Sequence, residues 1–133
     1  MVIDQLLLDE LSAQAKVSPR LRQAYDLRNT PEDNSQRMLN ALEPGTVMPI
    51  HRHRDTSETV VVLRGKVLWI YFDDKGNEAD RFVVAPNSEL CGISAPKGQW
   101  HSLVCLESGT VILEAKDGRY EAQRAEDVLS VWS

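Results

Sequence analysis

The sequence predicts an all-β sandwich or barrel preceded by one N-terminal helix. From residue 37 onward, short segments rich in Val, Ile and aromatic residues follow one another. Turn signals separate these segments at intervals of about 8–12 residues, which is typical of sandwiches and barrels. The first 17 residues differ, because their apolar side chains recur at helical spacing, as Ile3, Leu6, Leu7 and Leu11.

The predicted helix covers residues 1–17, and both of its ends carry recognisable signals. Asp4 is of a type that caps a helix start. Pro19 restricts Ser18 to extended geometry and so ends the helix. The polar, turn-rich segment 28–36 then predicts a loop.

The predicted strands are short and β-branched, and a turn at Arg64-Gly65 divides the longest apolar segment into two. Pro49 indicates the end or the edge of its strand. The segments are RMLNAL (37–42), TVMPIHRH (46–53), ETVVVLRGKVLWIYF (58–72), RFVVAP (81–86), LCGIS (90–94), WHSLVCLE (100–107) and TVILEAKDG (110–118). We therefore expect one domain over residues 1–133, with the barrel at 37–116. The tail, 117–133, is expected to pack back through Trp132.

Composition limits the kind of partner. A chain of 133 residues, 42% of them hydrophobic, suits one domain with a substantial core. The net charge of −5, with acids and bases interspersed, argues against a nucleic-acid surface. The start lacks the basic region of a signal peptide, and no apolar run approaches the ~18 residues that span a membrane. We expect a cytoplasmic protein with a small-molecule ligand, and no disulfide between Cys91 and Cys105.

The histidines predict a metal site. His51 and His53 are two apart, so in a strand they face the same side, roughly 7 Å apart along the chain. A hairpin brings Glu58 alongside them, and His101 is the one histidine that remains. Three imidazoles and a carboxylate suit one divalent Zn, Fe, Mn, Ni or Cu ion better than Ca or Mg, which prefer oxygen ligands.

These residues also carry a resemblance to the cupin superfamily. In GTVMPIHRHRDTSETVVVLRG, the positions Gly45, His51, His53, Glu58 and Gly65 meet every interval of the first cupin motif. PKGQWH, which ends at His101, is similar to the core of the second motif.

Two positions depart from the second motif. Its usual glycine six before the proline is absent, since Gly92 lies four before Pro96. Its usual asparagine four after the histidine is Cys105. We expect Cys105 to be a small buried hydrophobe rather than a fifth ligand, and Cys91 to lie in the core.

More narrowly, the chain resembles the WbuC family of cupin-fold metalloproteins, named from bacterial O-antigen gene clusters. The similar stretches are SPRLR, QRMLNALEPGT and the tail KDGRY with its later tryptophan. The resemblance implies a cupin-type double-stranded β-helix (jelly roll) with an N-terminal α-helix. It also implies one divalent metal on His51, His53, Glu58 and His101, and a carbohydrate or sugar-nucleotide-like ligand.

Two classes of function follow from this interpretation. The first is a metal-dependent isomerase, epimerase or oxygenase that acts on a carbohydrate or small polar metabolite, a small-molecule dioxygenase included. The second is a non-catalytic metal- or sugar-binding module that regulates polysaccharide synthesis. Cupins commonly pair through sheet edges, so a homodimer is expected.

Arg37 is the predicted substrate-binding residue. It opens an apolar strand expected to border the metal strand. An arginine there could hold an acidic substrate group within about 10 Å of the metal and so fix its orientation. The alternative is a solvated surface position, which we favour for Arg20, Arg22 and Asn40.

Overall fold

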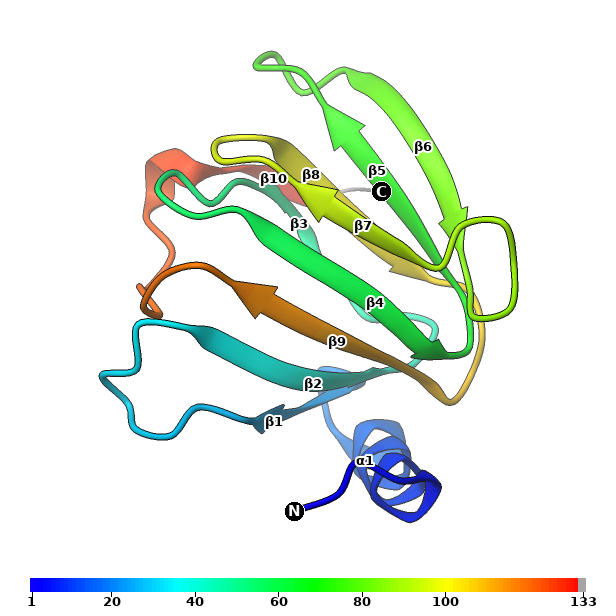
Figure 1. Cartoon of the computed structure of the whole chain (residues 1–133). Helices are drawn as coiled ribbons and strands as arrows, with labels where there is room; N and C mark the ends of the chain where they lie inside the picture. Colours follow the sequence, from blue (N-terminus) through cyan, green and yellow to red (C-terminus); the bar gives the residue numbers. More distant parts are fainter. Residues whose placement is uncertain (132–133) are drawn as a thin grey trace.

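Two five-stranded antiparallel sheets face each other in the computed structural model, which describes residues 1–131 (Figure 1). The first sheet has the order β1 (Arg22–Asp26), β2 (Gln36–Leu42), β9 (Thr110–Lys116), β4 (Glu58–Arg64) and β7 (Gly92–Ala95). The second has the order β10 (Val128–Val131), β3 (Pro49–His51), β8 (Trp100–Cys105), β5 (Val67–Phe72) and β6 (Glu78–Val84). The predicted all-β jelly roll with an N-terminal helix is confirmed.

Helix α1 (Gln5–Val17) covers the outer face of the first sheet (Figure 1). The Asp4 side chain accepts a hydrogen bond from the Leu7 amide at 3.0 Å, so the predicted cap is present. The apolar face of the helix packs against strands β2 and β9 through a cluster of six buried residues, Leu8, Leu11, Ala15, Leu39, Ala41 and Val111. None of the helices in residues 1–131 has the length and apolar character that a bilayer crossing requires.

The interior of the barrel changes from apolar to polar along its axis. In β8 the inward row runs from Cys105 and Leu103 to His101. In β9 the inward row runs from Ile112 to the charged Glu114 and Lys116. Strands β8 and β9 therefore contribute both to the core and to a polar cavity. The core consists of Leu42, Val60, Val62, Val67, Trp69, Val84, Ala95, Leu103, Cys105 and Ile112.

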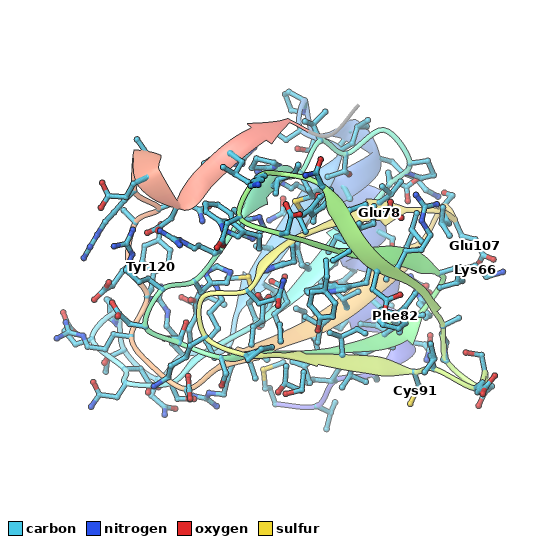
Figure 2. The ribbon with its side chains drawn as sticks, turned by 90° about the horizontal axis from the view of Figure 1, so that it is seen from above. Lys66, Glu78, Phe82, Cys91, Glu107 and Tyr120 are labelled. Atoms are coloured by element: carbon cyan, nitrogen blue, oxygen red, sulfur yellow. The ribbon has the colours of Figure 1, made fainter. Side chains whose placement is uncertain are left out.

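The two ends of the molecule differ accordingly. Figure 2 shows Tyr120, which lines the polar cavity, on one side, and Lys66 with Glu107 on the other. Lys66 and Glu107 lie 3.4 Å apart at the apolar end, where one turn joins β4 to β5 and another joins β8 to β9. The cavity therefore opens at the end of the barrel where the Tyr120 segment lies.

Several local predictions need correction. Strands β1 and β10 lie outside the range 37–116. The sequence of β1, RQAYD, shows no alternation of apolar residues, and that of β10, VLSV, is only four residues long. The strand predicted at 46–53 is reduced to Pro49–His51, since Pro49 cannot donate to the ladder. Cys91 is exposed rather than in the core, and both cysteines are free. Trp132 lies outside the described residues.

The turn between β4 and β5 requires glycine. Gly65 has φ +85°, and a Cβ added there would come within 2.6 Å of the Thr110 Cα. We expect Gly65→Ala to lower the free energy of unfolding by about 2–4 kcal/mol, through backbone strain and overpacking. Gly76→Ala is the matched control, because φ is +82° but the new methyl meets only Leu129 Cδ1 at 3.7 Å. It should cost about 1 kcal/mol. Equal losses in chemical denaturation would contradict the steric argument.

Candidate metal centre

Three histidines and one glutamate converge at the polar end of the barrel. His51 ends β3 and pairs directly with His101 of β8, His53 follows β3, and Glu58 opens β4. One ring nitrogen from each histidine lies within 4.8 Å of the others. The structure therefore brings together the four residues that the sequence predicted, from both sheets of the barrel.

Backbone carbonyls fix the orientation of two of these rings. The Nδ1 atom of His51 lies 2.9 Å from the Pro49 carbonyl oxygen, and that of His101 lies 2.9 Å from the Gln99 carbonyl oxygen. A carbonyl oxygen only accepts, so each neutral ring carries its proton on Nδ1. The Nε2 lone pair is then left free, which is the arrangement usual behind metal-binding histidines.

The Glu58 carboxylate supplies the strongest indication of a cation. Its Oε2 lies 3.1 Å from His53 Nε2 and 3.3 Å from His101 Nε2. This buried oxygen has no hydrogen-bond partner among the described residues, and it faces the free lone pair of His101. Facing lone pairs repel unless a proton or a cation lies between them. Neighbouring ligands about 2.1 Å from a metal lie about 3 Å apart, so these residues fit a divalent ion.

The electrostatics keep the ligands in their binding form. Burial, and then the neighbouring His101, lower the pKa of His51 to about 3. Burial acts to raise the pKa of Glu58, but a proton that His101 or His53 shares with its carboxylate outweighs burial and holds that pKa well below its usual value. At neutral pH His51 is therefore a neutral imidazole and Glu58 a carboxylate, the forms that coordinate metals.

A cavity of about 870 Å³ contains this group of residues. Trp69 forms part of its wall and stacks on His101, with ring centroids 4.9 Å apart and planes at 10°. Two buried polar atoms of the wall have no hydrogen-bond partner among the described residues, Trp69 Nε1 and Asn40 Oδ1. Buried polar groups are normally paired, so these atoms are available to a ligand.

Glu114 is a cavity residue that the sequence did not indicate. It lies on the inward face of β9, between Met38 of β2 and Val60 of β4 in the register. Burial and the charge of Glu58 raise its pKa to about 8. Its strand reads TVILEAK, where three consecutive apolar residues hide which face is inward. Once that face is known, an acidic residue on it is the signal of a site.

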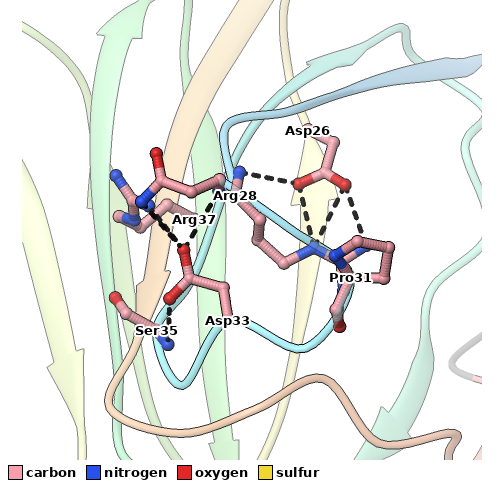
Figure 3. A network of polar contacts seen from close by, with 7 residues as sticks. Asp26, Arg28, Pro31, Asp33, Ser35 and Arg37 are labelled. Carbon is pink, nitrogen blue, oxygen red and sulfur yellow. Dashed lines mark hydrogen bonds and ion pairs between the residues drawn. The ribbon is translucent and has the colours of Figure 1, made fainter.

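Arg37 does not reach this cavity, which corrects the prediction for the substrate anchor. Alternate residues of β2, Gln36, Met38 and Asn40, line the cavity, so Arg37 faces outward with Leu39. Its guanidinium Nη2 lies 3.0 Å from Asp33 Oδ2, in a polar network on the loop before β2 (Figure 3). We therefore exclude Arg37 from the site.

Other residues of that sequence region do line the cavity. Arg20, Arg22 and Asn40, which we expected on the solvated surface, form part of its wall, together with Lys116. Cys105 lies in the apolar core, where its thiol donates to the Glu107 carbonyl at 3.1 Å. It does not line the cavity, in agreement with the expectation that it is not a ligand.

Solved structures with this architecture are cupins. The chain is similar to KdgF from Halomonas sp., with 19% identity, a TM-score of 0.62, and coverage of 78% of this chain and 85% of KdgF. It is similar to oxalate oxidase in complex with glycolate, with 18% identity, a TM-score of 0.62, and coverage of 80% of this chain and 56% of the other. It is also similar to oxalate decarboxylase from Bacillus subtilis, whose Mn(II) centres have been characterised. The identity is 21% and the TM-score 0.59, and the match covers 82% of this chain and 27% of the decarboxylase.

The fold is a cupin-type jelly roll, and its three-histidine group could hold a metal ion. The chain belongs to the family described as Domain of unknown function (DUF6016), which it matches over residues 3–84. That match includes three of the four predicted ligands and ends before His101. A search of curated proteins finds no match to the sequence. The chain spans only 56% of oxalate oxidase and 27% of oxalate decarboxylase, and at these identities the likeness shows the fold alone.

Replacing His101 tests whether β8 contributes a ligand to the metal centre. We expect His101→Ala to weaken metal affinity as severely as His51→Ala, by more than about 100-fold, since losing only the group that orients a ligand costs about 10–100-fold. Metal titration of the two variants measures this, and circular dichroism of the metal-free proteins checks that the barrel remains folded. Full metal occupancy of His101→Ala would overturn the assignment.

Glu114 should make the stability of the metal-free protein depend on pH. A carboxyl whose pKa is raised to about 8 contributes stability that is fully present below its unfolded value of 4.5 and is lost as pH rises to about 8. Glu114→Gln removes this titration. We measure the free energy of unfolding with denaturant from pH 5 to pH 8. Its value for the variant should rise relative to that of the wild type by up to about 1.4 kcal/mol per pH unit. A constant difference between the two proteins would contradict the raised pKa.

Proposed function

We propose that this cupin binds one divalent metal through His51, His53, Glu58 and His101, and acts on a carbohydrate or sugar-nucleotide-like molecule in the same cavity. The observation that carries the proposal is the Glu58 Oε2 atom, buried beside two histidine Nε2 atoms without a hydrogen bond among the described residues. A cation is the partner that this oxygen lacks. The ion is Zn, Fe, Mn, Ni or Cu, which imidazole and carboxylate ligands suit.

The cavity supports a polar organic ligand beside the metal. Its volume of about 870 Å³ falls within the range of about 300–1,000 Å³ usual for small-molecule sites. Trp69 Nε1 is a free donor and Asn40 Oδ1 a free acceptor in its wall. A polyhydroxylated molecule can satisfy both, because each hydroxyl donates and accepts.

Glu114 favours an enzyme over a binding module. It is a carboxyl outside the proposed ligand set, and it contacts Glu58 in the same cavity. A bound divalent metal supplies Lewis acidity or an activated water. Beside it, Glu114 can hold a proton and pass it to or from a ligand, as an isomerase or epimerase requires. A dioxygenase or a non-catalytic module needs no such group.

The biological setting is proposed from the WbuC resemblance. It places the protein in the cytoplasm, in bacterial surface polysaccharide (O-antigen) metabolism. A homodimer is proposed because both sheets end in strands with one unpaired edge, β1 and β7 in one sheet and β10 and β6 in the other.

Elemental analysis of protein purified without added metal or chelator tests the proposal. We expect about one divalent ion per chain. A ligand that binds only the folded state adds about 4 kcal/mol at a thousandfold excess over its dissociation constant. EDTA should therefore lower the melting temperature, and the same metal should restore it. A metal-free sample that melts at the unchanged temperature would refute a stabilising site.

A further inference from the structure

Unpaired basic side chains gather in the metal cavity. Most arginines of the described residues lie within ion-pair distance of an acid, as do Arg28, Arg37, Arg52, Arg54, Arg64, Arg81 and Arg124. Several bases have no such partner within residues 1–131. Arg20, Arg22 and Lys116 line the metal cavity, whereas Arg119, Lys16, Lys75 and Lys97 do not. The protein has a net charge of −5, so a shortage of acids does not explain this.

Arg22 is the best placed of the three. It opens β1 opposite Leu42, faces inward and is half-buried. Its one side-chain hydrogen bond to the described part of the chain runs from Nη1 to Met48 Sδ at 3.1 Å, and a thioether is a weak acceptor. Most of the five guanidinium N–H donors therefore remain unused in a partly desolvated position, which is unfavourable unless an anion satisfies them.

Lys116 adds a positive charge at the other end of the same sheet, since it lies opposite Gln36 of β2 whereas Arg22 lies opposite Leu42. It pairs with Glu58 in the register of β9 with β4, yet the two make no ion pair. Glu58 Oε2 instead lies beside the Nε2 atoms of His53 and His101. The Glu58 carboxylate, which is nearest to Lys116 in the register, is thus directed toward the histidines of the metal centre. The Lys116 ammonium group therefore remains available to a ligand.

A neighbouring hollow holds two arginines that are neutralised within the chain, although it shares Lys116 with the metal cavity and Arg119 in its wall has no ion pair among the described residues. The hollow of about 390 Å³ is lined by Arg52 and Arg54, among other residues. Arg52 Nε lies 2.8 Å and Arg54 Nη2 lies 2.9 Å from the same oxygen of Asp127. Those guanidinium groups are already bound within the chain, whereas those of the metal cavity are not.

We propose that the ligand of the metal cavity is an anionic carbohydrate, whose carboxylate or phosphate group is held by Arg22 with Arg20. This inference rests on the proposed function and specifies its substrate class. The same molecule reaches the metal through another oxygen, and Asn40 Oδ1 accepts from one of its hydroxyls. The guanidinium fork binds either anion through paired hydrogen bonds. Attachment at two points fixes the orientation of the sugar.

Calorimetric titration of the metal-loaded protein tests this inference. The probes are galacturonate, galactose 1-phosphate and neutral galactose. We expect at least one anionic probe to bind tenfold or more tightly than galactose, the least that a hydrogen bond to a charged group provides. The comparison of the two anions identifies the preferred group. Arg22→Gln should abolish the preference, Arg22→Lys should restore part of it, and Arg20→Gln should weaken it.

Arg81→Gln is the matched control, since Arg81 is exposed on β6 and paired with Glu78, and it should leave binding unchanged. Metal content and melting temperature of each variant separate a binding defect from misfolding. Three results would overturn the inference. They are equal affinity for galactose and the anions, no binding of either anion at about 10 mM, which corresponds to a binding free energy of about 3 kcal/mol, and an undiminished preference in Arg22→Gln. Absence of metal from the wild-type protein would instead refute the proposed function.

Discussion

The repulsion between facing lone pairs at Glu58 is the constraint around which the barrel is arranged. Glu58 Oε2, buried within 3.3 Å of two histidine nitrogens, has no hydrogen-bond partner in the described part of the chain. Burying a carboxylate without a partner is unfavourable, and a bound cation converts the same geometry into a favourable one. The Pro49 and Gln99 carbonyls strengthen this dependence, because they hold the His51 and His101 protons on the far side of each ring. The four side chains are thus preorganised for a cation before one binds.

Strand register delivers these side chains to one level of the barrel. His51 pairs with His101 across β3 and β8, and Glu58 pairs with Lys116 across β4 and β9. A two-residue step along β8 or β4 leads from the cavity into the core, from His101 to Leu103 and from Glu58 to Val60. Trp69 lies at the boundary, since it belongs to the core and stacks on His101. The apolar end therefore stabilises the same strands that hold the polar end in position.

The fold class and the four converging residues were predictable from local patterns. Short β-branched segments indicate strands, Asp4 indicates the helix start, and His51 with His53 indicates a shared face. Arg37 was misplaced because the direction of a side chain depends on which face of β2 is inward. That choice is decided by α1, which packs on Leu39 and Ala41 and so turns Arg37 outward with them. Glu114 was missed for a related reason, since its face is set by pairing with β2 and β4. Strands β1 and β10 lack the periodicity that identifies a strand in a single sequence.

The residues proposed to bind the metal and those proposed to bind the anionic group come from different parts of the chain, because the latter lie on or near β1. The proposed metal ligands come from β3, β4 and β8 and the turn after β3, each held in its sheet by neighbouring strands, whereas Arg22 lies on β1, an edge strand paired only with β2. Arg20 precedes this strand in the segment that links it to α1. Amino-acid substitutions in this segment can alter which molecule is recognised, while the metal centre stays intact. Related chains could thus diverge in ligand preference through β1 and its approach, with the same four-residue centre retained behind it.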